Sequence, residues 1–376
     1  MANAQPLTDR LPERWRPLAE RSRHLLQRYQ DAGGAWPASP RFAPYQFSWF
    51  RDGSFIADGA SAAELHDEAT RFHDWCSRVL EREAPAVDRV RRMLAAGDQP
   101  ADADYLPARY RLDGTRQVDD WWNFQVDGYG TWLWALERHL DRTGLPVDHW
   151  AGGIDVAVRY LVDTGTDTCR DWWEENRDHT HVTTLAGVAA GLHAAERVGT
   201  LSDASAALEV ADRCVSLIRE QGTHDGRLAK WLGGTGLDAS LLAVSALYDV
   251  LPLEDPLVVR TVAEVENRLT DGGVHRYEAD TFYGGGQWPV LAALLAWHHA
   301  RAGDLDRAGQ LLDWVVSTAD GGLLLPEQVP PLLAGDALDE WLERWGPSAH
   351  PLLWSHGMFL GALSTYARSE ERGGPS

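Results

Sequence analysis

The chain has 376 residues, 44% of them hydrophobic, and its formal net charge at pH 7 is -21. Such an acidic balance disfavours nucleic acid and anionic membranes as partners, because both are bound through basic patches. Three cysteines without a CxxC spacing argue against a disulfide framework or a zinc site, and no signal peptide or membrane-spanning run is found, so we expect a cytoplasmic protein.

Helical periodicity recurs along the whole chain, whereas the alternation that is typical of strands is scarce. The pattern predicts twelve main helices and one additional short helix at 85–96. The main helices are expected at 12–30, 54–66, 67–83, 128–143, 147–164, 182–198, 202–220, 238–248, 257–270, 288–302, 304–318 and 354–368.

Short and long connections alternate between these helices. Long loops inside a compact domain are usually functional, and six of them alternating with tight turns indicate a closed ring of six helical hairpins. We therefore predict an all-α, single-domain (α/α)6 barrel over residues 1–376, with all long loops at one end. The long connections are 31–53, 97–127, 165–181, 221–237, 271–287 and 319–353.

Aromatic and polar residues cluster in these long loops. The chain has 18 tryptophans, and aromatic faces beside hydrogen-bonding groups suit ligands such as sugar rings. The clusters contain Tyr45, Trp49, Arg51 and Asp52 in the first loop, Trp121 in the second, Trp173, Glu174 and Glu175 in the third, Arg276 and Trp288 in the fifth, and Glu327 and Trp354 in the sixth.

The carboxylates in these clusters are the candidates for acid–base chemistry. Glu174 and Glu175 follow two indoles, and a crowded carboxyl against an apolar wall has a raised pKa, as a proton donor near neutral pH requires. The alternative is a solvated pair that caps the following helix. Glu327 lies between prolines that stiffen its backbone. Two carboxylates on opposite loops of an aromatic cavity are the arrangement used for glycoside hydrolysis.

Other chemistries remain as alternatives. His179 and His181 lack a matching third and fourth ligand, so we expect neither a metal nor a cofactor. The same ring could bind sugars without turnover, or host a lyase or epimerase. A lyase would need cations for its acidic substrate, yet Arg51 and Arg276 are the only basic residues in these clusters.

Six blocks of the chain resemble, in the same order, those of the glucoamylase-like enzymes, family fifteen of the glycoside hydrolases. The resemblance covers residues from about 45 to 365. The blocks are Tyr45-x-x-x-Trp49-x-Arg51-Asp52, Trp121 with Gln125-x-Asp127-Gly128, Trp173-Glu174-Glu175, Arg276-Tyr277 through Trp288, Pro326-Glu327-Gln328, and Trp354-Ser355.

The resemblance implies roles for these residues. It makes Glu174 the general acid and Glu327 the general base of an inverting, exo-acting α-glucosidase that needs no metal. Arg51, Asp52 and Arg276 would hold the terminal glucose, and Glu175 would lie towards the leaving group. We expect the chain to carry neither the N-terminal β-sandwich of many bacterial members nor a starch-binding module. We therefore expect a short substrate, first isomaltose, with maltose and trehalose as alternatives; the oligomeric state is left open.

Overall fold

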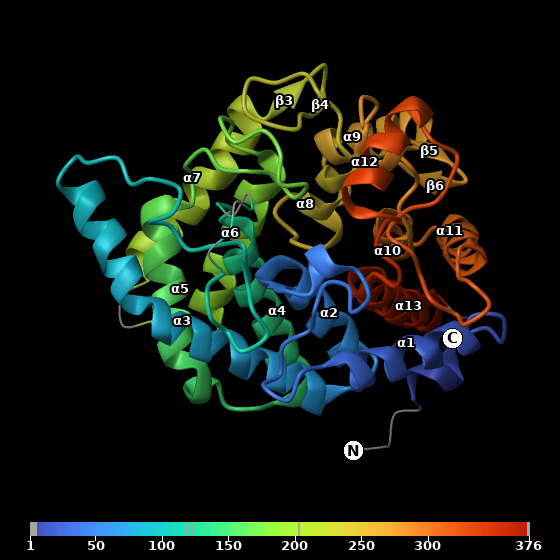
Figure 1. The fold of residues 1–376 in the computed structure, drawn as a ribbon, viewed down its shortest axis with the longest axis horizontal. Helices are drawn as coiled ribbons and strands as arrows, with labels where there is room; N and C mark the ends of the chain where they lie inside the picture. The colour runs from blue at the N-terminus through green and yellow to red at the C-terminus, as the bar shows by residue number, and fades with distance from the viewer. Residues whose placement is uncertain (1–5, 118, 120, 122–123, 202–203, 374–376) are drawn as a thin grey trace.

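The computed structural model describes residues 6–117, 119, 121, 124–201 and 204–373, and six helical segments form its closed inner ring (Figure 1). The ring closes because α13 packs against both α10 and α2. The inner segments are α2 (Phe50–Ala62), α4 (Asp127–Thr143), α6 (Val182–Arg197), α8 (Ala243–Ala246) with the 3-10 turn before it (Ala239–Leu242), α10 (Pro289–Ala302) and α13 (Leu353–Gly373).

Six outer helices surround this ring, each packed against an inner segment (Figure 1). α1 packs on α13, so helices from the two ends of the chain form the sixth hairpin. The outer helices are α1 (Arg16–Tyr29), α3 (His66–Ala95), α5 (Ala151–Thr164), α7 (Ser205–Gln221), α9 (Pro256–Arg268) and α11 (Leu305–Ser317). The predicted all-α (α/α)6 barrel is confirmed.

Burial distinguishes inner from outer helices. In α6, nearly every side chain from Val182 to Ala195 is buried, because the helix meets neighbours on all sides. In α7, the buried residues form one stripe at helical spacing: Ala207, Ala211, Cys214 and Ile218. An outer helix needs only one apolar face, whereas an inner helix must be apolar nearly all round.

Glycines let the inner helices approach backbone to backbone. A Cβ atom at Gly59 of α2 would lie 2.0 Å from the carbonyl oxygen of Gly357 in α13. A Cβ atom at Gly130 of α4 would lie 2.3 Å from the carbonyl oxygen of Gly187 in α6. Both distances are far below a van der Waals contact, so only glycine fits at these crossings.

The predicted break between helices 67–83 and 85–96 is wrong. One helix, α3, runs from His66 to Ala95 straight through Pro85. An interior proline costs about 3 kcal/mol through a lost hydrogen bond and a steric clash. The apolar stripe of α3 continues on both sides of it, from Phe72 and Val79 to Val87 and Val90, and the burial of this stripe outweighs the cost.

The expected helix 238–248 is also different in the structure. A 3-10 turn occupies Ala239–Leu242, and α8 adds a single turn, Ala243–Ala246. The helix ends there because the Leu247 carbonyl accepts a hydrogen bond from the Trp134 indole at 3.0 Å, and Asp249 turns into the left-handed region with φ 52°.

The long connections gather at one end of the ring and contain regular structure that the sequence pattern missed. Three antiparallel pairs of two-residue strands lie in them: β1 (Ser48–Trp49) with β2 (Arg109–Tyr110), β3 (Thr223–His224) with β4 (Arg227–Leu228), and β5 (Thr270–Asp271) with β6 (Gly273–Val274). A short helix, α12 (Leu338–Trp345), lies in the sixth.

Helix boundaries agree with the prediction to within a few residues. α2 begins four residues earlier than predicted, so Arg51 and Asp52 lie in its first turn and not in a loop. The predicted start of the seventh helix, at residue 202, lies outside the described residues, as do residues 118, 120, 122 and 123 of the second loop.

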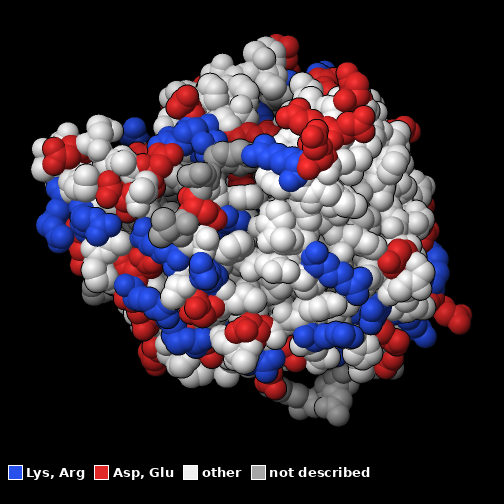
Figure 2. Space-filling model, in the orientation of Figure 1, with Lys and Arg blue, Asp and Glu red and all other residues white. Residues whose placement is uncertain are grey.

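Charged side chains of both signs lie on the surface. Figure 2 shows acidic and basic side chains interspersed over the face in view, without a continuous basic band among the residues described. None of the described helices combines the length and the apolarity that crossing a bilayer requires.

Candidate active site

The long connections enclose a pocket of about 360 Å³ at their end of the barrel. Every residue that the sequence predicted for the site lines it: Tyr45, Trp49, Arg51, Asp52, Trp121, Trp173, Glu174, Glu175, Arg276, Trp288, Glu327 and Trp354. The barrel therefore brings together residues that are far apart in the sequence, since Tyr45 and Trp354 both line the pocket.

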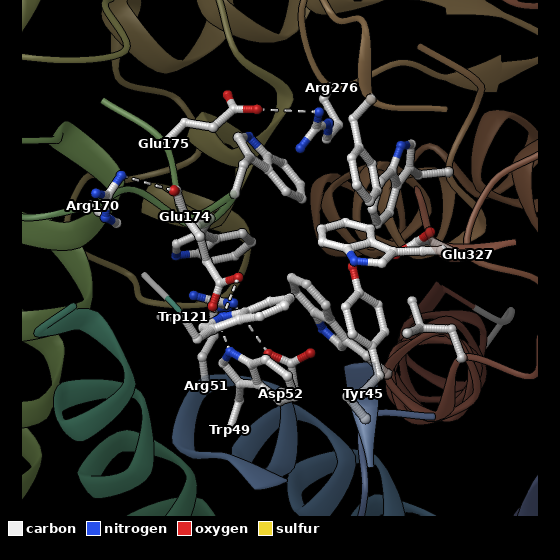
Figure 3. Close-up of a pocket in the computed structure, with 18 of the residues that line it drawn as sticks. Tyr45, Trp49, Arg51, Asp52, Trp121, Arg170, Glu174, Glu175, Arg276 and Glu327 are labelled. Atoms are coloured by element: carbon white, nitrogen blue, oxygen red, sulfur yellow. Dashed lines mark hydrogen bonds and ion pairs between the residues drawn. The ribbon is translucent and has the colours of Figure 1, made fainter. Parts of the chain in front are cut away.

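The loop that carries Glu174 is held in a tight turn by Asp171. The carboxylate of Asp171 accepts hydrogen bonds from the backbone N–H groups of Trp173 and Glu175, both at 2.9 Å. Glu174 itself adopts the left-handed conformation, with φ 64°, which costs a non-glycine residue about 1 kcal/mol. The turn thereby aims the side chain of Glu174 into the pocket (Figure 3).

Two indoles bind the carboxylate of Glu174. The Trp49 Nε1–H group donates to Oε1 at 2.6 Å, and the Trp121 Nε1–H group donates to Oε2 at 3.0 Å. Burial raises the pKa of Glu174, whereas the charge of Arg51 and the two indole hydrogen bonds lower it. The group is thus held in place while burial keeps it able to take up a proton.

The side chain of Glu175 points away from that of Glu174, towards Arg276 (Figure 3). Its carboxylate accepts a hydrogen bond from the Tyr277 hydroxyl at 2.6 Å and lies 3.5 Å from Arg276 and 3.9 Å from Lys230. Burial raises the pKa of Glu175, and Arg276 opposes the shift.

Glu327 lies on the other side of the pocket from Glu174 (Figure 3). Only 1% of the residue is exposed, and its Oε2 atom makes no hydrogen bond within the described part of the protein. Burial raises the pKa of Glu327 to about 7, although the Tyr45 hydroxyl and Arg276 favour its ionised form.

Arg51 and Asp52 form the floor of the pocket. The guanidinium of Arg51 lies 3.3 Å from both Asp52 and Asp127, and it donates to the Gln125 side chain at 3.1 Å. Burial raises the pKa of Asp52 to about 6, against the charge of Arg51. A charged donor and a carboxylate side by side can bind neighbouring hydroxyl groups of one ligand.

Several buried polar atoms in the pocket wall make no hydrogen bond within the described residues. They include Arg51 Nε, Asp52 Oδ2, Trp172 Nε1, Trp288 Nε1, Trp354 Nε1 and Glu327 Oε2. A buried polar group without a partner costs about 1–3 kcal/mol. A ligand that carries many hydroxyl groups can satisfy these donors and acceptors while its apolar faces contact the surrounding indoles.

Sequence reasoning missed part of the pocket wall. Trp341 and Trp345 come from α12, whose apolar residues Leu338, Trp341, Leu342 and Trp345 follow helical spacing and were the available signal. Also missed as site residues were Ala38, Arg170, Trp172, Asn176, Phe282 and Leu352.

Basic residues outside the predicted clusters also lie at the site: Arg170 lines the pocket, and Lys230 lies 3.9 Å from Glu175. Lys230, from the fourth loop, lies 3.1 Å from Asp171 and 3.0 Å from Asp238. Asp238 also accepts a hydrogen bond from the Trp173 indole at 2.9 Å. Lys230 is therefore neutralised by its own carboxylates. His179 stacks on Trp231 at 4.3 Å, and His181 binds the backbone carbonyls of Cys169 and Asn176 at 3.0 Å.

Comparisons with known proteins agree with this geometry. The sequence profile of the glycosyl hydrolases family 15 matches residues 18–325. An isomaltose glucohydrolase from Kribbella flavida is 46% identical over 349 residues, which cover 91% of each chain. The chain belongs to glycosyl hydrolase family 15. This family membership makes the protein a glycoside hydrolase.

Solved structures include close neighbours of this family 15 chain. A glycosidase variant with a glutamate replaced by alanine, in complex with glucose, is 43% identical with a TM-score of 0.92, and the match covers 96% of this chain and 99% of that one. A bacterial glucoamylase complexed with acarbose is 18% identical with a TM-score of 0.74, over 94% of this chain and 55% of that one. The second likeness concerns the fold alone.

Proposed function

We propose that the protein is an inverting, exo-acting α-glucosidase that releases β-glucose from the non-reducing end of short α-1,6-linked glucosides, with isomaltose as the preferred substrate. The observation that carries this proposal is the presence of Glu174 and Glu327 on opposite sides of one aromatic pocket (Figure 3). Paired carboxyl groups that flank a sugar supply both the acid and the base of glycoside hydrolysis.

In the proposed reaction, Glu174 donates its proton to the glycosidic oxygen as the bond to the anomeric carbon breaks. Glu327 removes a proton from a water molecule, which attacks the anomeric carbon from the opposite face. The α-linked substrate thus yields β-glucose, and each carboxyl returns to its starting state once Glu327 passes its proton to solvent and Glu174 regains one.

The environments of the two groups support these roles. The proton donor must be protonated before the reaction, and burial raises the pKa of Glu174. The base must be ionised. With a pKa of about 7, Glu327 is half ionised at neutral pH and mainly ionised above it, and the Tyr45 hydroxyl and Arg276 favour this ionised form.

The substrate assignment has two supports. The pocket volume of about 360 Å³ is near the lower end for ligand sites, which suits a disaccharide better than a long glucan. The related protein from Kribbella flavida, which is 46% identical to this chain, is an isomaltose glucohydrolase. We also propose a cytoplasmic location, in keeping with the free, buried thiols of Cys76, Cys169 and Cys214.

A side-by-side assay on isomaltose, maltose, trehalose and dextran tests the substrate, with proton NMR of the first turnovers as the test of stereochemistry. We expect the highest kcat/KM on isomaltose, glucose as the sole product, and the β-anomer first. Early α-glucose would contradict the inverting mechanism, and internal oligosaccharides released from dextran would contradict the exo-acting one.

The acid is tested separately with α-glucosyl fluoride, whose leaving group needs little protonation. We expect Glu174→Gln to lose most activity on isomaltose and to keep a large part of it on the fluoride. Glu327→Gln should lose activity on both substrates, because both need the activated water. The reverse pattern would exchange the two roles.

A further inference from the structure

Arg109 lies directly behind the two indoles that bind Glu174. The strand pair β1–β2 places Trp49 opposite Arg109 in register. The guanidinium carbon lies 3.9 Å from the centre of the Trp121 ring, 4.1 Å from that of Phe47 and 5.2 Å from that of Trp49. One buried cation therefore contacts three aromatic rings at once, within the distance range of cation–π interactions.

The guanidinium is itself fixed by hydrogen bonds. It donates to the Pro44 carbonyl at 2.9 Å and to Asp119 Oδ2 at 2.6 Å. Asp119 also accepts the backbone N–H group of Trp121 at 3.2 Å. The Arg109–Asp119 pair thus ties the backbone that carries Trp121 to β2, the strand that pairs with Trp49.

We propose that Arg109 is a positioning residue for the general acid, because it fixes Trp49 and Trp121 so that their indole N–H groups hold the carboxylate of Glu174 in its working orientation. The inference rests on the proposed role of Glu174. Arg109 does not line the pocket, so it acts on the reaction only through the two indoles and through its charge.

The contacts to Glu174 explain why a fixed pair of indoles matters. Trp49 and Trp121 hold one carboxylate oxygen each, at 2.6 and 3.0 Å, so a shift of either ring moves the proton donor. A misplacement of 1 Å can reduce a rate about 100-fold. A cation over an indole face also polarises the ring, which makes its N–H group a stronger donor.

The charges around Glu174 give the direction of the pH effect. Burial raises the pKa of Glu174, and Arg51, the two indoles and Arg109 lower it. Asp52 and Tyr45 also face it from α2 and the first loop, and Arg170 binds its backbone carbonyl at 3.4 Å. Loss of the Arg109 charge should therefore move the alkaline limb of kcat/KM, where the acid loses its proton, to higher pH.

The simpler explanation is that Arg109 only forms part of the folded core, where 2% of it is exposed. In that case its replacement would lower stability and reduce activity on every substrate by the same factor. It would leave the pH profile unchanged, because the acid would keep its position and its surroundings.

The experiment compares Arg109→Met, which removes the charge, with Arg109→Lys, which keeps the charge but loses the planar guanidinium. Arg111→Met is the matched control, because Arg111 is exposed two residues along the chain. Each variant is assayed on isomaltose and on α-glucosyl fluoride across the pH range, and its melting temperature is measured.

For Arg109→Met we expect kcat on isomaltose to fall about tenfold or more. KM should change little, activity on the fluoride should be largely retained, and the alkaline limb should lie at higher pH. Arg109→Lys should lose kcat on isomaltose with its alkaline limb near that of the wild type, and Arg111→Met should match the wild type throughout. Equal losses on both substrates, or wild-type kinetics in Arg109→Met, would overturn the inference.

Two additional variants keep the test decisive. If Arg109→Met does not fold, Asp119→Asn removes the ionic partner of Arg109 at a partly exposed site, and a selective loss on isomaltose is again expected. Glu174→Gln distinguishes a failure of the proposed acid from a failure of the proposed role of Arg109. If it too fails to retain activity on the fluoride, the proposed acid is wrong; if it alone retains that activity, only the role of Arg109 is wrong.

Discussion

Glu327 combines almost complete burial with a carboxylate oxygen that makes no hydrogen bond to the described part of the chain. An ionised carboxylate in such a place is costly to the folded state, and its raised pKa of about 7 expresses that cost. The ionised form of Glu327, which the proposed reaction requires, therefore lowers the stability of the folded protein, as is common for catalytic groups in enzymes.

The first prediction concerns Glu327 and the pH dependence of stability. The folded protein binds the Glu327 proton up to about pH 7, whereas an ordinary glutamate releases it near 4.5. The contribution of the protonated Glu327 carboxyl to the unfolding free energy is therefore fully present below pH 4.5 and is lost as the pH rises to 7. Glu327→Gln cannot ionise, so its unfolding free energy should gain on that of the wild type as the pH rises. We expect the difference in favour of the variant to be on the order of 1–3 kcal/mol larger at pH 8 than at pH 5.

Chemical denaturation at the two pH values measures this difference. Glu340→Gln serves as the control, because Glu340 is exposed on α12. An advantage of Glu327→Gln that is the same at pH 5 and pH 8 would show that burial does not disfavour the ionised form of Glu327.

The second prediction concerns Glu175, which lies 2.6 Å from the Tyr277 hydroxyl and near two cations. Glu175→Gln should raise KM for isomaltose about tenfold, the loss expected for one charged hydrogen bond, and should lower kcat far less. Initial-rate kinetics measure both constants. A fall in kcat as large as that of Glu174→Gln would assign Glu175 to the chemical step.

Residues with a short motif could be predicted from the sequence, and residues that act through tertiary contacts could not. Trp173, Glu174 and Glu175 are adjacent in the chain, so their pattern is visible without the fold. Arg109 and Lys230 belong to no motif, and their importance depends on contacts to Trp49 and Asp171, which only the folded barrel brings near them.

At the scale of elements, α12 differs from every helix of the two rings. None of its residues is buried, yet Trp341 and Trp345 line the pocket. Trp345 stacks on Trp121 at 5.8 Å, and Trp341 donates to the Thr281 carbonyl at 3.0 Å. The helix therefore contributes to the site without contributing a core of its own.

The third prediction follows from that separation. Trp341→Ala should raise KM for isomaltose several-fold while the melting temperature stays close to that of the wild type, because no core is disturbed. Leu342→Ala, at an exposed position on the same helix, should change neither. A large fall in melting temperature for Trp341→Ala would show that α12 stabilises the whole barrel.

Among the helices, the prediction fails at α3 and α8. Periodicity reports burial on a face, so it identified the inner and outer helices. The two errors have different causes. In α3 the proline at 85 predicted a break, although the apolar stripe continues beyond it. At the end of α8 no buried face decides the boundary, and the Leu247 carbonyl accepts a hydrogen bond from the Trp134 indole. The two-residue strands β1 and β2 are too short for any pattern.

At the scale of the whole molecule, closure of the ring depends on contacts that leave no room for a side chain. The crossing of α2 and α13 brings Gly59 to the backbone of Gly357, so the barrel closes only if both positions stay free of a Cβ atom.

The fourth prediction tests that crossing. Gly59→Ala would place a Cβ atom 2.0 Å from the Gly357 carbonyl oxygen and should cost on the order of 2–3 kcal/mol of unfolding free energy. Gly321→Ala is the matched control, since a Cβ atom there meets nothing within 4 Å. Equal stability of the two variants in denaturant unfolding would mean that α2 and α13 can move apart freely.

The packing of α13 against α1, α2 and α10 also determines when the barrel can fold during synthesis on the ribosome. The inner face of α2 leaves the ribosome long before its neighbour α13, at a delay of roughly tens of seconds at ordinary rates of synthesis. Until then a helix whose residues are all buried in the folded protein has one side open to water. The nascent protein should therefore need a chaperone during this interval, and a chain stopped before Leu353 should aggregate instead of folding into a smaller barrel.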